Sequence, residues 1–207
     1  MKFHFQHCCL VMIVVAISCC LPLCGQQLNG GIITPAGDTI ACSIALKPKD
    51  AGLKSRTGEA YLYDYVVAIF PNDSVRVLYP GSIKAFFRRV TEGTHSSTNW
   101  YHAGFINAKH DMLIKDPPAM RPIFLRELVK GGYYQLWYFE QADPGSRYSR
   151  VFVLEKKGTG IYHYFNSTRQ LKKLLSHWPR ENKPDYKDWF KGKQLMVIDY
   201  NRYQSGE

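Results

Sequence analysis

The chain contains 207 residues, of which 45% are hydrophobic and 21% charged, and its formal net charge is +10. This composition supplies enough apolar side chains for a folded core, which excludes a disordered polar chain. Beyond the N-terminus no apolar run approaches the ~18 residues that a membrane-spanning helix requires. We therefore expect no helical transmembrane segment in the mature chain.

Residues 1–25 have the features of an export signal. Lys2 supplies a positive charge, and the apolar stretch from Leu10 to Ile17 (LVMIVVAI) has the length of a signal-peptide core. Small residues precede Gln26, which fits cleavage by an ordinary signal peptidase. We expect residues 26–207 to form a single exported domain, located in the periplasm, at the outer membrane or outside the cell.

A lipid anchor is the alternative to a soluble exported form. The stretch from Ala16 to Cys19 (AISC) resembles a bacterial lipobox, and cleavage there would leave an acylated Cys19. A lipobox usually has Leu at the position that Ala16 occupies, so the soluble form is the favoured interpretation.

Cysteine usage excludes a disulfide framework. Five of the six Cys lie within residues 1–25, and only Cys42 belongs to the expected mature domain. One thiol cannot form an intramolecular disulfide. Because Cys42 alternates with Ile40, Ile44 and Leu46, we expect all four side chains to face the core, with Cys42 acting as a small hydrophobic residue.

Strand-like runs dominate the first half of the chain. Two of them flank the turn Pro35-Ala-Gly-Asp38 within the segment 31–44 and predict a β-hairpin. The Tyr- and Val-rich run 59–70 predicts a strand, after a polar loop over 47–58. Further strands are expected over 75–79, 83–90 and 100–106, with a polar connection over 91–99.

The middle of the chain combines an expected helix with a meander. Phe124, Leu125, Leu128 and Val129 lie at helical spacing, so a short helix is expected over 123–129, ended by Gly131-Gly132. In the meander, strands over 133–140, 148–155 and 161–165 are joined by turns over 142–146 and 157–160.

The C-terminal part is expected to be helical. Asn166 or Ser167 can cap a helix whose apolar stripe is Leu171, Leu174, Leu175 and Trp178. Pro184 can begin a second helix that carries Tyr186, Trp189 and Phe190, and residues 195–200 fit either a helix or a buried strand. The predicted fold is therefore α+β, a mainly antiparallel sheet that is curved or a partial barrel, packed by short C-terminal helices.

A set of short motifs is similar to a family of secreted proteins from Bacteroidota-type bacteria. The motifs are Gly31-Ile-Ile-Thr with Gly37-Asp-Thr-Ile40, Tyr79-Pro-Gly-Ser-Ile83 with Phe86, Phe124-Leu125 with Leu128 and Gly131, and Tyr200-Asn201. They span most of the expected mature chain, which departs from the family where Leu136-Trp137 stands in place of Leu-Tyr. No activity is assigned to the family, so the resemblance implies export and architecture rather than a reaction.

No catalytic or metal-binding spacing is found in the sequence. His95, His102 and His110 do not have the spacing of a zinc site such as HExxH. No Ser lies in a GxSxG turn, and no glycine-rich loop opens a helix. We expect neither catalytic residues, nor a metal, nor a cofactor. The alternative is a metal- or His/Asp-dependent hydrolase that acts on an envelope polymer, with its site near residues 95–111. Alanine substitutions at His102 and His110 test this alternative.

Aromatic residues carry the binding hypothesis. Tyr133, Tyr134, Trp137, Tyr138 and Phe139 fall in one expected strand, so both of its faces carry rings. Such rings either fill a core or, beside arginines, stack on sugars or bases. The candidate binding residues are Trp100, Tyr101, His102, Trp137, Arg147 and Arg150.

Net charge and two short motifs complete the functional expectations. Residues 1–25 hold Lys2 but no Asp or Glu, so their removal changes the net charge from +10 to +9. This surplus fits an anionic glycan or another envelope component as partner, or a solvated basic surface. Thr39 and Ser74, each between Asp and an aliphatic residue, resemble O-glycosylation acceptors. The predicted function is a non-catalytic, envelope-associated or secreted binding or accessory module.

Overall fold

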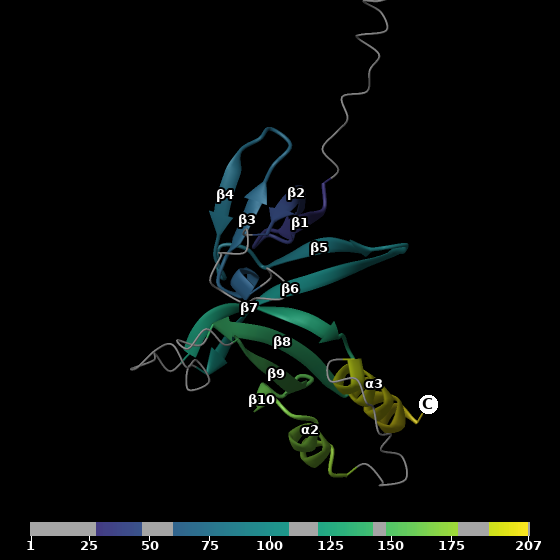
Figure 1. Ribbon diagram of the computed structural model, residues 1–207. Helices are drawn as coiled ribbons and strands as arrows, with labels where there is room; N and C mark the ends of the chain where they lie inside the picture. The colour runs from purple at the N-terminus through teal and green to yellow at the C-terminus, as the bar shows by residue number, and fades with distance from the viewer. Residues whose placement is uncertain (1–27, 47–59, 108–119, 143–147, 178–190, 207) are drawn as a thin grey trace, which may run out of the picture.

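The computed structural model describes residues 28–46, 60–107, 120–142, 148–177 and 191–206. In these ranges ten strands form one antiparallel sheet in the order β10-β9-β8-β7-β6-β5-β1-β2-β3-β4, and it carries two α-helices (Figure 1). This architecture confirms the predicted α+β fold. The strands are β1 Gly30–Ile33, β2 Thr39–Ala45, β3 Val66–Ile69, β4 Val75–Leu78, β5 Ala85–Glu92, β6 His95–Asn107, β7 Met120–Val129, β8 Tyr134–Ala142, β9 Tyr148–Lys156 and β10 Ile161–Phe165.

The opening hairpin β1–β2 forms as predicted. The Thr34 carbonyl accepts from Gly37 N at 2.9 Å, and Gly37 has a φ of 101°, which glycine adopts without strain. Cys42 and Ile44 are buried, whereas Ile40 is 40% exposed, so its expected inward position is wrong. The reason is that β3 pairs only with residues 43–45 of β2, and the turn end of the hairpin extends beyond the core.

The segment 59–70 is not one strand. A 3₁₀-helix, η1 (Ala60–Tyr63), precedes β3, and both Leu62 and Tyr63 are buried. Consecutive residues of a strand point to opposite faces, whereas a helical turn can direct both neighbours into the same core. The Tyr63 ring lies 6.0 Å from the rings of both Tyr101 and Tyr138, so η1 packs on the sheet.

The polar stretch 91–99 is also strand rather than connection. β5 and β6 form a long hairpin in which Glu92 pairs with His95 across a two-residue turn. The tip of this hairpin is exposed, so its side chains need no apolar character. The pairing of the two backbones, which the composition does not show, determines the structure here.

The helix expected over 123–129 is wrong, because these residues belong to the central strand β7. β7 pairs with β6 on one side and β8 on the other, and Ile123, Phe124 and Leu125 are all buried. A strand buried on both faces is apolar without alternation, and its spacing then imitates that of a helix. A bulge between Glu127 and Val129 precedes the turn into β8.

Two helices follow the sheet. In α2 (Thr168–Leu174), Ser167 forms a capping box with Gln170, and Leu171 and Leu175 are buried, as predicted. The ambiguous residues 195–200 lie in α3 (Lys191–Ser205), which is a helix. The loop 47–58, the turn 143–146, Trp178 and the helix expected from Pro184 lie outside the described residues. No helix in the described part of the chain is long and apolar enough to cross a membrane.

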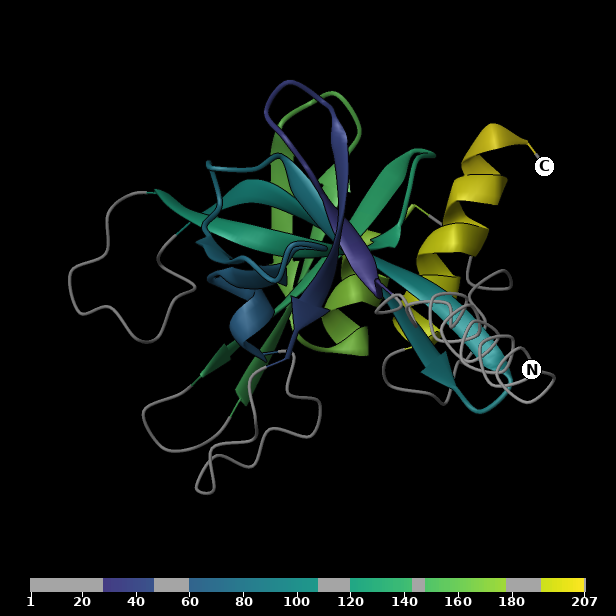
Figure 2. The same cartoon turned by 90° about the horizontal axis from the view of Figure 1, so that it is seen from above.

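The sheet has two faces of different character. The helix face packs against η1, α2 and α3, and its aromatic core is Phe86, Tyr101, Phe124, Tyr138 and Phe152. We call the opposite face of the sheet the open face. There the Tyr164 hydroxyl of β10 accepts a hydrogen bond from Asn107 N of β6 at 3.0 Å, so the sheet curves around this face (Figure 1). Ile123 and Val153, which lie on this face by register, are buried within the curve. Both views place α3 and the β5–β6 hairpin tip on the same side of the molecule (Figure 2).

Candidate functional site

The open face brings together aromatic side chains from three strands. Phe87 of β5, Trp100 and His102 of β6 and Trp137 of β8 lie on this face by strand alternation and register. Their ring centroids are 4.8 Å apart for Phe87 and Trp100, 6.2 Å for Trp100 and His102, and 5.4 Å for His102 and Trp137. We call these four residues the open-face aromatic cluster.

Two carboxylates hold the cluster in place. Glu127 Oε2 lies 3.2 Å from His102 Nε2, and Trp137 Nε1 donates to Glu155 Oε2 at 2.9 Å. Glu155 also accepts from Tyr162; burial, followed by the charge of Glu155 and this hydrogen bond, raises the pKa of Tyr162. The rings are therefore oriented by charged acceptors rather than by packing alone.

His102 is the titratable group of the cluster. Burial lowers the pKa of His102, Lys130 lowers it further, and the carboxylate of Glu127 acts in the opposite direction. The net direction favours the neutral ring, which can meet the Glu127 carboxylate only through an N–H on Nε2. His102 thus acts as a hydrogen-bond donor that is fixed by Glu127.

This arrangement has the chemistry of a sugar-binding surface. The half-buried rings of Trp100 and Trp137 offer apolar faces against which the C–H face of a sugar ring can stack. The carboxylates of Glu127 and Glu155 are acceptors for hydroxyl groups, and the Glu127 side chain is 14% exposed. Rings and acceptors alternate along one face of neighbouring strands.

The structure assembles three of the predicted binding residues and separates the others. Trp100, His102 and Trp137 are in the cluster. Tyr101 is fully buried on the helix face, where its ring stacks on Phe86 at 4.5 Å, so it cannot contact a ligand on the open face. Arg150 pairs across the strands with Glu140 on the helix face, 3.4 Å from its carboxylate, and Arg147 lies outside the described residues.

A cavity of about 940 Å³ lies beside the cluster. β6 and β7 are paired as far as Tyr101 and Arg126 and then separate, so the cavity opens between the β5–β6 hairpin, the end of β7 and the start of α3. Trp100 and Glu127 line it together with Arg88 and Arg126. We call this cavity the fork cleft.

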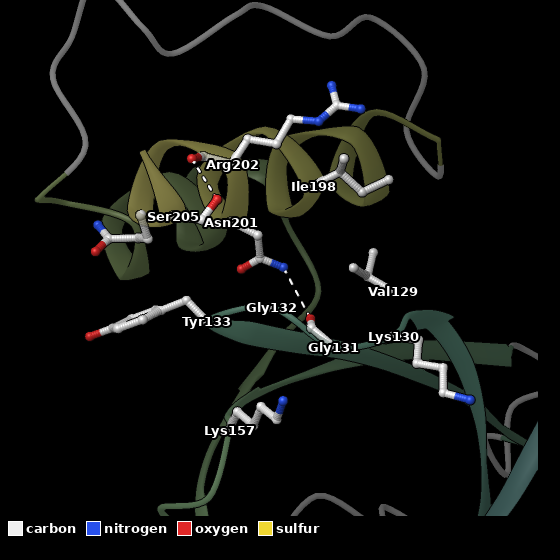
Figure 3. Close-up of a pocket in the computed structure, with 11 residues that line it drawn as sticks. Val129, Lys130, Gly131, Gly132, Tyr133, Lys157, Ile198, Asn201, Arg202 and Ser205 are labelled. Carbon is white, nitrogen blue, oxygen red and sulfur yellow. Dashed lines mark hydrogen bonds between the residues drawn. The ribbon is translucent and has the colours of Figure 1, made fainter. Parts of the chain in front are cut away.

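A second cavity, of about 570 Å³, lies between α3 and the β7–β8 turn (Figure 3). Asn201 points into it, donates to the carbonyls of Gly131 and Tyr134 at 3.3 and 2.8 Å, and accepts from Tyr134 N at 2.8 Å. A Cβ at Gly132, whose φ is 80°, would collide with Asn201. These contacts anchor α3 to the turn, which gives the Tyr200-Asn201 motif an architectural role.

Of the histidines in the alternative hydrolase region 95–111, the two that the structure describes lie far apart. His95 and His102 are seven residues apart on one extended strand, or ~23 Å at ~3.3 Å per residue. Among the residues that the structure describes, no group of three His, Cys, Asp or Glu could hold a metal ion; His110 and Asp111 lie outside them. Burial raises the pKa of Cys42 to about 11, which confirms its expected role as a small buried residue.

The two candidate modification residues differ in access. Thr39 is exposed at the start of β2. The Ser74 hydroxyl donates to Asn72 Oδ1 at 2.6 Å, and the preceding Asp73 has a φ of 59°. Thr39 is therefore the more accessible hydroxyl of the two.

Sequence reasoning misses several residues of this candidate site. Glu127, Glu155, Arg88 and Arg126 are not among the candidates that the sequence suggests. Their spacing from Trp100 and Trp137 carries no local signal, because strand register alone makes them neighbours. Comparison of the chain with protein-family models, curated proteins and solved structures finds no match.

Proposed function

We propose that this protein is an exported, non-catalytic module that binds a glycan of the cell envelope. The observation that carries the proposal is the open-face aromatic cluster, in which Trp100, His102 and Trp137 form a continuous surface. Stacking of a nucleic-acid base on an aromatic side chain contributes about 1–3 kcal/mol, and we take the same scale for a sugar that stacks on tryptophan. Two tryptophans on neighbouring strands can therefore supply most of the affinity of a weak glycan binder.

The roles of the two acids support binding rather than catalysis. Glu155 accepts from Trp137 and Tyr162, and Glu127 faces His102, so each carboxylate orients a ring of the binding surface. A general acid or base needs access to the proton that it transfers. Here each carboxylate already holds an aromatic side chain in position, which favours a positioning role over proton transfer.

Export and the envelope location depend on sequence features. The apolar stretch from Leu10 to Ile17 after Lys2 supports cleavage near residue 25. The resemblance to secreted Bacteroidota-type proteins also supports export. The net charge of +9 that remains after removal of residues 1–25 fits the acidic polymers of an envelope. Mass spectrometry of the mature N-terminus distinguishes cleavage before Gln26 from an acylated Cys19.

The test is a glycan array followed by calorimetry on each ligand that binds. Trp100→Ala and Trp137→Ala are expected to weaken binding about tenfold each, the equivalent of ~1.4 kcal/mol per ring. Phe105→Ala is the matched control, because Phe105 is an aromatic residue of β6 that is 61% exposed and outside the cluster. No ligand above background, or equal affinity for all three variants, would overturn the proposal.

A hydrolase is the second candidate function, and the His102–Glu127 contact is the observation in its favour. It predicts that the bound glycan is shortened during incubation and that His102→Gln abolishes this cleavage. Chromatography of the glycan after incubation with the wild-type protein decides between the two functions. Intact glycan supports the binding module, and shortened chains support the hydrolase.

A further inference from the structure

The fork cleft is built by the separation of two strands. Beyond the pair Tyr101–Arg126, the β5–β6 hairpin diverges from β7, which remains paired with β8 (Figure 1). The first turns of α3 complete the cleft, and Gln194 Nε2 of α3 donates to the Leu128 carbonyl at 2.6 Å. Because the sheet is open here, side chains of both faces line one cavity of about 940 Å³.

Cations outnumber acids among the residues that line the cleft. Arg88 and Asn99 are directly paired across β5 and β6, and Arg126 Nη2 donates to Asn99 Oδ1 at 2.8 Å. Both arginines are half-buried, which strengthens their attraction for an anion relative to a fully solvated cation. Lys130 and Lys191 are exposed at the rim.

Two acids also line the cleft. Glu92 is exposed near the tip of the β5–β6 hairpin, and Glu127 lies 3.2 Å from His102. The cleft therefore has an excess of two positive charges over its lining acids. Arg88 is paired with Asn99 across the strands and Arg126 is hydrogen-bonded to it, and both arginines supply forked N–H donors of the kind that suits an oxyanion.

We propose that the fork cleft binds the oxyanion substituent of an acidic glycan whose neighbouring sugar stacks on Trp100. This inference rests on the proposed function and specifies its substrate class. Trp100 and Glu127 belong to the cleft lining as well as to the aromatic surface, so one ligand can contact both. The carboxylate of a uronic acid is the favoured group, and a sulfate ester offers the same oxyanion chemistry.

The experiment compares ligands that differ only in charge. Calorimetry is carried out with oligogalacturonate, with the same oligosaccharide as its methyl ester, and with a sulfated oligosaccharide. Wild-type protein is expected to bind oligogalacturonate at least tenfold more tightly than the methyl ester, because the ester removes the charge-assisted hydrogen bonds. A preference for the sulfated ligand would identify sulfate as the source of the oxyanion.

Substitutions in the cleft test whether the preference for oligogalacturonate over its methyl ester arises there. Arg88→Gln and Arg126→Gln are expected to weaken oligogalacturonate binding about tenfold while leaving methyl-ester binding unchanged. Lys173→Gln on α2 removes one exposed positive charge outside the cleft and is the matched control. Arg126→Lys retains the charge but not the forked donors, so an intermediate loss is expected.

The outcomes separate this inference from the proposed function. Equal binding of acid and ester, both lost in Trp100→Ala, overturns the oxyanion site but retains the glycan-binding surface. Binding of none of the three ligands, together with an empty array, overturns both. Since Arg126 contacts Asn99, thermal unfolding of each variant is compared with wild type. If Arg126→Gln does not fold, Lys130→Gln with Lys191→Gln tests the cleft, and an unchanged affinity for oligogalacturonate overturns the site.

Discussion

The helix face and the open face of the sheet use the same residue types for different purposes. Tyr101 and Trp100 are sequence neighbours on β6, yet Tyr101 is fully buried and stacks on Phe86. Trp100 is half-buried and contacts Phe87 at 4.8 Å. Strand alternation assigns one aromatic residue to the core and the next to the open face, which is the proposed binding surface. The two faces therefore predict opposite patterns of stability and binding for neighbouring substitutions.

Each face also contains a carboxylate in contact with an aromatic donor. On the helix face, Glu140 is 8% exposed and accepts from the Tyr138 hydroxyl, and Arg150 lies 3.4 Å away. On the open face, Glu155 accepts from Trp137. Burial, followed by the charge of Glu140, raises the pKa of Tyr138. The buried contact contributes to folding, whereas the open-face contact fixes the orientation of a half-buried ring.

The largest expected difference between the faces concerns Phe86 and Phe87. Phe86→Ala should lower the free energy of unfolding by ~3–5 kcal/mol, because it opens a cavity beside Tyr101 and Phe124. Phe87→Ala should cost about 1–2 kcal/mol, since its half-buried ring loses fewer contacts. Urea unfolding of both variants measures the difference. Equal destabilisation would contradict the assignment of the two faces.

The two carboxylates provide the next comparison. Glu140→Ala should destabilise the fold by about 2–3 kcal/mol, because the buried Tyr138 hydroxyl loses its acceptor. Glu155→Ala should cost about 1 kcal/mol or less, since its partner Trp137 is only half-buried. Glycan affinity should show the opposite order, with a loss of roughly fivefold for Glu155→Ala, the equivalent of ~1 kcal/mol of lost ring orientation.

Both variants are measured by urea unfolding and by calorimetry with the best ligand from the array. Glu155→Gln serves as a control, because its amide oxygen can still accept from Trp137 Nε1. If Glu140→Ala lowers the affinity of a folded protein as strongly as Glu155→Ala does, the separation of roles between the two faces is lost.

Local chemistry made part of this fold predictable. The β1–β2 hairpin follows from the turn at Gly37-Asp38, and α2 follows from the cap that Ser167 forms with Gln170. The strand β7 was missed because its environment is non-local. Phe124 and Leu128 have helical spacing, but pairing with β6 and β8 determines the backbone conformation.

The residues of the candidate site also fall into those that the sequence predicts and those that it does not. Trp100, His102 and Trp137 could be singled out because aromatic density is visible in the sequence. Glu127 and Glu155 could not be assigned to them, because each joins the cluster only through strand register. The fork cleft requires knowing where the pairing of β6 and β7 ends, which no local pattern indicates.

The smallest expected effect is a pH dependence that originates on the open face. Because burial lowers the pKa of His102 below its ordinary 6.5, the unfolded chain binds a proton at a higher pH than the folded chain does. The corresponding stability is complete above pH 6.5 and is lost as the pH falls toward the lowered pKa of the folded state. Glu127 opposes this shift and Lys130 adds to it.

His102→Gln removes the titrating group but retains a donor for Glu127. The free energy of unfolding of this variant should therefore fall less between pH 7 and pH 5 than that of the wild type. His95→Gln, which alters an exposed histidine at the start of the same strand, is the control. Parallel pH profiles for wild type and His102→Gln would show that burial does not oppose protonation of His102. The rings of the open face would then be hydrated rather than desolvated by their contacts, which would contradict their proposed role in stacking on a sugar.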